Sequence, residues 1–175
     1  MIEIPEGMIL IGDNAFKDCI NLKQVIINEG LERIGDNAFE GCTSLTTIFS
    51  IGRGEFGVQS CSHMYYGCTS LTSAPGIASS GMSSLSCWNM FRNCTSLSSI
   101  GGLSCNYLST ECYSYMFAGC TSLEYLDIRD IDLSMFTKSY SNYNTLIASV
   151  NKKADKKNVD DSLREYNTVL TQKAD

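Results

Sequence analysis

A short phrase occurs five times along the 175-residue chain and restricts what the chain can fold into. The five copies read AFKDCINL, AFEGCTSL, MYYGCTSL, MFRNCTSL and MFAGCTSL. Their cysteines follow one another at steps of 23, 26, 26 and 26 residues, and they are Cys19, Cys42, Cys68, Cys94 and Cys120. A fixed period in the twenties is typical of a solenoid, in which each repeat contributes one coil. A nucleophile is rarely needed five times, so the phrase indicates architecture rather than catalysis.

The apolar residues inside one repeat predict the structure of each coil. From Leu22 to Ile27 they first step by about two, as in a short strand, whereas the closing AFxxC spacing fits one helical turn. One coil cannot bury these side chains alone, so coils must stack, and each buried Leu or Phe contributes roughly 1.5–3 kcal/mol. The predicted columns of stacked side chains contain Phe16, Cys19, Leu22, Phe39, Cys42, Leu45, Tyr65, Cys68, Leu71, Phe91, Cys94, Leu97, Phe117, Cys120 and Leu123.

Two segments carry a resemblance to a known family. The stretch IGDNAFKDCINLKQVIINEGLERIGDNAFEGCTSLTTI resembles the BspA-like leucine-rich-repeat family, and the 26-residue units resemble its longer variant. The resemblance implies a right-handed β-solenoid used for adhesion or protein binding, with no catalytic residues. We therefore predict an α/β repeat protein, a leucine-rich-repeat right-handed solenoid of about five coils over residues 1–141. A helical C-terminal element over residues 142–175 would cap the solenoid or dock it to a larger assembly.

Charge and hydropathy exclude several kinds of partner. The net charge is -6, and between Gly57 and Leu123 the only formally charged residues are Arg92 and Glu111. Because a nucleic-acid partner requires a continuous basic surface, we expect none. No apolar run approaches the roughly 20 residues of a membrane span, and no secretory signal is visible. The expected location is extracellular or at a cell surface if a signal was removed, and otherwise in a virion or the cytoplasm.

The residues that could carry chemistry are better explained structurally. Nine cysteines include no C-x-x-C pair, so we expect no metal and no cofactor, and buried reduced thiols are favoured over some disulfide. The single histidine, His63, has no carboxylate nearer in sequence than Glu55, so no catalytic residue is expected. His63 shares a column with Asn14, Asn37, Asn89 and Tyr115, which we interpret as solvent-facing. Asp13 and Asp36 recur before this column and are expected to cap the helical turn.

Candidate partner-binding residues vary while the repeat around them stays constant. On the outer face of the strands these are Thr47, Phe49, Ser73, Ser99 and Tyr125. On the returning side, aromatic groups among serines are suited to recognition of a protein or a glycan, and these are Tyr66, Trp88 and Tyr115. Two functions fit the sequence. One is a non-enzymatic binding or adhesion module on a bacterial cell surface, and the other is a structural or decoration subunit of a phage virion.

Overall fold

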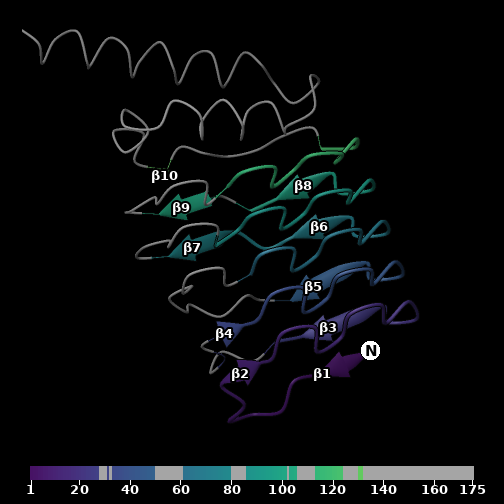
Figure 1. The fold of residues 1–175 in the computed structure, drawn as a ribbon, viewed down its shortest axis with the longest axis vertical. Coiled ribbons are helices and arrows are strands. Elements are labelled where there is room, and N and C mark those ends of the chain that lie inside the picture. Colours follow the sequence, from purple (N-terminus) through teal and green to yellow (C-terminus); the bar gives the residue numbers. More distant parts are fainter. Residues whose placement is uncertain are drawn as a thin grey trace, which may run out of the picture.

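The chain forms a stack of coils, each containing short strands. The computed structural model describes residues 1–27, 31, 33–49, 61–79, 86–101, 103–105, 113–123 and 130–131. Within these residues there are strands and no helix, and Figure 1 shows the strands rising one above another from β1. The strands are β1 (Ile2–Glu3), β2 (Leu10–Ile11), β3 (Gln24–Ile26), β4 (Arg33–Ile34), β5 (Thr47–Phe49), β6 (Ser73–Ala74), β7 (Ile77–Ser79), β8 (Ser99–Ile100), β9 (Leu103–Cys105) and β10 (Asp130–Ile131).

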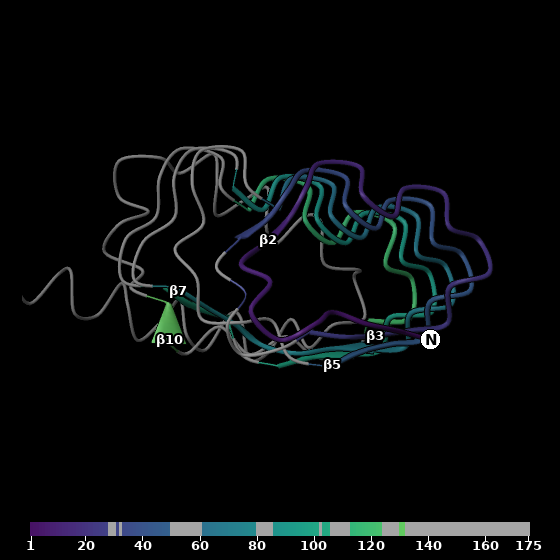
Figure 2. The same cartoon turned by 90° about the horizontal axis from the view of Figure 1, so that it is seen from below.

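The repeat places equivalent strands side by side and in parallel. The largest sheet has five strands in the order β1-β3-β5-β6-β8, and smaller sheets pair β2 with β4 and order β10-β9-β7. Thr47 pairs with Ser73, and Ser73 pairs with Ser99, so residues one period apart are neighbours. Strands are parallel because each coil returns the chain to the same side before the next strand begins. Figure 2 looks along the stack, and the described coils overlay one another around a common interior.

Aromatic rings from successive coils form a continuous stack through the interior. The ring centroids of Phe16 and Phe39 lie 5.2 Å apart, and those of Phe39 and Tyr65 lie 5.5 Å apart. The same stack continues from Tyr65 to Phe91 at 5.4 Å and on to Phe117 at 5.7 Å, with neighbouring ring planes no more than 14° apart. Stacked rings at this spacing exclude water from the centre. Because each ring is covered by the adjacent coils, the stack stabilises several coils together and not a single coil alone.

The segment that closes each repeat is not the expected helical turn. The amide of Lys17 donates to the carbonyl of Asn14 in its own coil at 3.1 Å, whereas the amide of Phe16 donates to Ala38 in the next coil at 2.8 Å. Alternate amides therefore hold the coil together and join it to its neighbour. The prediction is wrong because at least two residues in every coil take positive φ, which breaks a helix and turns alternate N–H groups outward.

The two positive-φ columns explain which residues recur there. The first column has φ between 54° and 58° and contains Asn14, Asn37, His63, Asn89 and Tyr115. The second lies directly before the repeat cysteine and contains Asp18, Gly41, Gly67, Asn93 and Gly119. Gly, Asn and Asp are the residues that enter this left-handed region at least cost. The first column is thus selected by backbone conformation and is not uniformly solvent-facing, since Asn89 is 2% exposed.

Most of the predicted columns are buried, with one departure at the N-terminal coil. The leucine, aromatic and cysteine columns are buried from the second coil onward, as is Leu22. Cys19 is exposed, and Phe16 is only partly buried. The physical reason is that no described coil stacks on the N-terminal side of this pair. Residues 142–175, expected to form a helical element, lie outside the described residues, so the coil count and the tail stay predictions.

Candidate functional site

The repeat cysteines are structural hydrogen-bond donors. The Cys94 thiol donates to the Tyr65 carbonyl at 3.0 Å, and Cys120 makes the same bond to Phe91 at 3.0 Å. The Cys42 thiol donates to Phe16 and the Cys68 thiol to Phe39, so each cysteine contacts the coil before it. Burial raises the pKa of Cys42 to about 11 and that of Cys120 to about 12, and it raises the pKa of Cys94 well above its ordinary value. Thiols with such raised pKa values are poor nucleophiles at neutral pH.

Asp13 and Asp36 cap the neighbouring coil instead of a helical turn. The Asp13 carboxylate accepts a hydrogen bond from the Asp36 amide at 3.0 Å, and the Asp36 carboxylate accepts one from the Ser62 amide at 3.1 Å. Burial raises the pKa of Asp36, although the hydrogen bond from Ser62 opposes the shift. The recurring aspartates therefore satisfy backbone donors across coils, and their spacing does not form an acid–base pair.

The strand face presents hydroxyl groups in one row. Ser73 and Ser99 are exposed and adjacent in register, whereas Thr47 is half-buried. The Thr47 hydroxyl oxygen is buried and has no hydrogen-bond partner among the described residues. The backbone of Phe49 lies in β5, but its side chain and the whole of Tyr125 lie outside the described residues. This face is thus a narrow serine surface with no described aromatic group.

The returning side brings the other three candidate residues into one cluster. His63 contacts Trp88 edge-on, with ring centroids 4.9 Å apart and an interplanar angle of 83°, and its ring lies 5.5 Å from that of Tyr66. The Arg92 guanidinium lies 5.8 Å from the centre of the Tyr115 ring, a cation–π distance. We refer to His63, Tyr66, Trp88, Arg92 and Tyr115 as the turn-side cluster.

Two further contacts hold this cluster in place, one between coils and one within a coil. The Asn93 side chain donates to the Tyr66 hydroxyl at 3.3 Å, and the Arg92 guanidinium donates to the Asn89 side-chain oxygen at 3.1 Å. Tyr115 is 50% exposed, whereas Tyr66, Trp88 and Arg92 are half-buried. Among the described residues Arg92 forms no ion pair with a carboxylate. The result is a preformed aromatic surface with one cation beside the Tyr115 ring.

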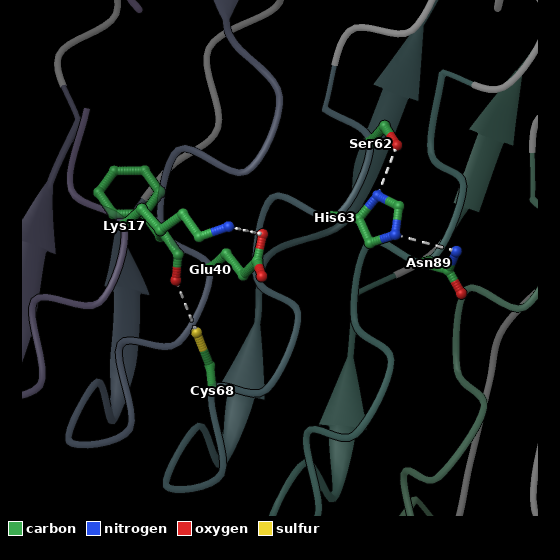
Figure 3. A network of polar contacts seen from close by, with 7 residues as sticks. Lys17, Glu40, Ser62, His63, Cys68 and Asn89 are labelled. Carbon is green, nitrogen blue, oxygen red and sulfur yellow. Dashed lines mark hydrogen bonds and ion pairs between the residues drawn. The ribbon is translucent and has the colours of Figure 1, made fainter. Parts of the chain in front are cut away.

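His63 is held by neutral neighbours on both ring nitrogens. Nδ1 lies 2.9 Å from the Ser62 hydroxyl, and Nε2 lies 3.2 Å from the side-chain nitrogen of Asn89 (Figure 3). Loss of hydration on burial lowers the pKa of His63 from 6.5, and the positive charges of Arg92 and Lys17 lower it further, while Glu40 opposes them. Within the described part of the chain no carboxylate hydrogen-bonds to this imidazole, so the orienting acid of a catalytic histidine is absent there.

The sequence prediction missed His63 and Arg92 as parts of the cluster, and Asn89 as the residue that joins them. The signal that identifies them is the period itself. Adding 26 to position 63 gives Asn89 and then Tyr115, and adding 26 to position 66 gives Arg92. In the ranges that the structure describes, no group of His, Cys, Asp and Glu residues could hold a metal ion. None of the described segments forms an apolar helix of the length that a membrane crossing requires.

Comparison with known proteins identifies the family. The model of the BspA type leucine-rich repeat region matches residues 1–100 and 61–162, in six copies. The chain therefore belongs to the BspA-type leucine-rich-repeat family, which confirms the resemblance noted in its sequence. This family consists in general of non-enzymatic, protein-binding repeats.

One solved structure and the curated proteins complete the comparison. The chain is similar to the crystal structure of the T. pallidum leucine-rich-repeat protein TpLRR, with 16% sequence identity and a TM-score of 0.33. That similarity covers 80% of this chain and 83% of the T. pallidum chain. No curated protein matches this chain.

Proposed function

We propose that this chain is a non-enzymatic binding module that recognises a protein partner through the turn-side cluster. The observation that carries the proposal is the backbone conformation of Tyr115, whose φ is 55°. In the same column the chain uses Asn at positions 14, 37 and 89, and Asn enters this region more cheaply than a bulky aromatic residue. The left-handed conformation costs an ordinary residue roughly 1–2 kcal/mol. A strained, half-exposed tyrosine is what a binding site would retain.

The chemistry of the cluster also favours a protein partner. Trp, Tyr and Arg are the residue types that contribute most to protein interfaces, and the cluster contains Trp88 beside His63 and Arg92 over Tyr115. Contacts within the cluster already fix several of its side chains, so little conformational entropy would be lost on binding. Arg92 is the only basic residue between positions 57 and 123, so few charges would have to be desolvated.

We further propose that the module acts in adhesion on a bacterial cell surface. This part rests on the family resemblance and on the uncharged serine and threonine surface, not on a geometric feature of the cluster. A virion subunit built on the same scaffold is the alternative. The identity of the partner separates the two, because a surface module binds a host or neighbouring-cell protein and a virion subunit binds another virion protein.

The test is cross-linking from two defined positions. A photoreactive phenylalanine analogue is introduced at position 115 and, as a control on the strand face, at position 99 of the full chain. We expect protein adducts from position 115 that excess wild-type chain competes away, and none from position 99. Competed adducts from position 99 alone, or no competed adduct from either position, would overturn the proposal.

A further inference from the structure

The hydrogen bonds around His63 define which of its nitrogens carries a proton. The Arg92 guanidinium can only donate, so the oxygen of the Asn89 amide faces Arg92, at 3.1 Å. The Asn89 nitrogen consequently faces His63 Nε2, at 3.2 Å, and donates to it. Nε2 therefore has no proton, and Nδ1 carries one and donates to the Ser62 hydroxyl at 2.9 Å. Ser62 in turn donates to the Trp88 carbonyl at 3.4 Å.

This chain of bonds tolerates only neutral His63. A second proton on Nε2 would place an N–H group opposite the NH₂ group of Asn89, so two donors would face each other. Turning the Asn89 amide by 180° would bring its oxygen to His63 but would place the NH₂ group against the Arg92 guanidinium. One bond is lost in either orientation. Because Asn89 is only 2% exposed, water has little access to replace the lost hydrogen bond.

The charged groups around His63 act on it in both directions. Arg92 and Lys17 disfavour a second positive charge on the imidazole, and Glu40 favours it. The Glu40 carboxylate is already paired with Lys17 at 3.1 Å, which weakens its attraction for His63. Figure 3 shows this ion pair beside the Ser62–His63–Asn89 chain. No other charged group is found to act on His63 in the described part of the chain.

We propose that His63 is a pH switch for the turn-side cluster, in which uptake of a proton breaks the bond to Asn89 and rearranges Trp88 and Arg92. His63 is half-buried, so the proton reaches it without unfolding. As regulation of the binding surface, this inference rests on the function proposed above, and partner affinity would fall on mild acidification. The switch itself is a property of the free chain and is tested without a partner.

The titration of His63 can be assigned without ambiguity because the chain has one histidine and one tryptophan. The imidazole resonances of the full chain are followed by NMR as the pH is lowered, and Trp88 fluorescence is recorded in parallel. We expect an imidazole midpoint below 6.5, with the fluorescence changing at the same midpoint because the two rings are in contact. An imidazole midpoint at or above 6.5, or Trp88 fluorescence that stays constant while His63 titrates, would overturn the switch.

Two variants of Asn89 test the donor conflict directly. In Asn89→Asp a carboxylate accepts from both His63 and Arg92, so the midpoint should rise above 6.5. Asn89→Gly removes the opposing donor without changing any charge, and glycine suits the φ of 55° at this position. Its midpoint should rise above that of the wild type. Unchanged midpoints in the variants that fold would contradict the proposal, whereas the cross-linking result at position 115 would stand regardless.

Discussion

At the scale of single residues, the aromatic stack contains one hydroxyl that lacks a role. Tyr65 is fully buried, and its hydroxyl has no hydrogen-bond partner among the described residues. The equivalent positions in the adjacent coils are Phe39 and Phe91. A buried polar group without a partner costs about 1–3 kcal/mol. The tyrosine in this column is therefore a liability for stability rather than a packing requirement.

We predict that Tyr65→Phe raises the free energy of unfolding by about 1 kcal/mol, because it removes the hydroxyl and keeps the ring. Urea titration followed by circular dichroism measures the change. Phe91→Tyr is the matched control and should lower stability by a similar amount, since it adds a hydroxyl to the same column. Loss of stability in Tyr65→Phe would mean that the hydroxyl has a partner outside the described residues.

The thiols provide a second prediction at this scale. Cys19 is exposed, whereas Cys42, Cys68, Cys94 and Cys120 are buried and donate to carbonyl groups. We expect a thiol reagent at neutral pH to label Cys19 in the native chain while these four react only on unfolding. Peptide mapping by mass spectrometry identifies the labelled positions. Rapid labelling of Cys94 in the native chain would disprove its structural role.

At the scale of the repeated element, the positive-φ column that contains Tyr115 trades stability for a binding residue. Tyr115 and Asn14 occupy equivalent positions, with φ of 55° and 58°, and both are exposed. We predict that Tyr115→Asn raises the free energy of unfolding by about 1 kcal/mol, because Asn adopts this conformation at lower cost. Asn14→Tyr is the reciprocal control and should lower it. Chemical denaturation measures both free energies of unfolding. Equal and opposite changes would support the cost of positive φ for tyrosine, whereas destabilisation by Tyr115→Asn would contradict it.

The same column makes stability depend on pH through His63. Its pKa in the folded chain is lower than its ordinary value of 6.5, so the unfolded chain binds the proton more tightly. The contribution of neutral His63 to stability should therefore be fully present above pH 6.5. It should be lost as the pH falls from there toward the lowered pKa of the folded state. Asp36, whose pKa is raised, contributes with the opposite sign.

A matched variant isolates the contribution of His63. In His63→Asn, which keeps a residue suited to positive φ, the loss of stability on acidification below 6.5 should be smaller than in the wild type. Thermal unfolding at several pH values measures both proteins. Identical pH profiles for the two would show that His63 is not the titrating group.

The sequence predicts well which residues of the repeat are buried, because burial follows from spacing. It predicts poorly the segment that closes the repeat, because that structure depends on the backbone conformation of single residues. The period correctly places Leu45, Phe91 and Cys94 inside, because a residue that recurs at one register must stack on its equivalents. The AFxxC spacing suggests a helix, however, since spacing does not reveal the sign of φ. Asn at positions 14, 37 and 89 was the available signal for left-handed turns.

At the scale of the whole molecule, the period predicts the parallel stack but not the end effects. Cys19 belongs to the same sequence column as Cys42, yet it is exposed because burial requires a coil on both sides. The cluster on the returning side was only partly predictable. Tyr66, Trp88 and Tyr115 stand out in the sequence, whereas His63 and Arg92 are recognised as members through their contacts with Trp88 and Tyr115 in the next coil. Whether residues 142–175 cap the solenoid or dock it to a larger assembly stays a prediction.

We propose that the molecule binds its partner through the turn-side cluster and not through the strand face. It is tested most directly by the dissociation constants of the cross-linked partner for the wild type, Tyr115→Asn and Ser99→Lys. We predict that Tyr115→Asn weakens binding about tenfold or more, equivalent to about 1.4 kcal/mol, although the variant is more stable. Ser99→Lys, an exposed change on the opposite surface, should leave the affinity within about twofold. The reverse result, with Ser99→Lys abolishing binding and Tyr115→Asn leaving it intact, would contradict binding through the turn-side cluster.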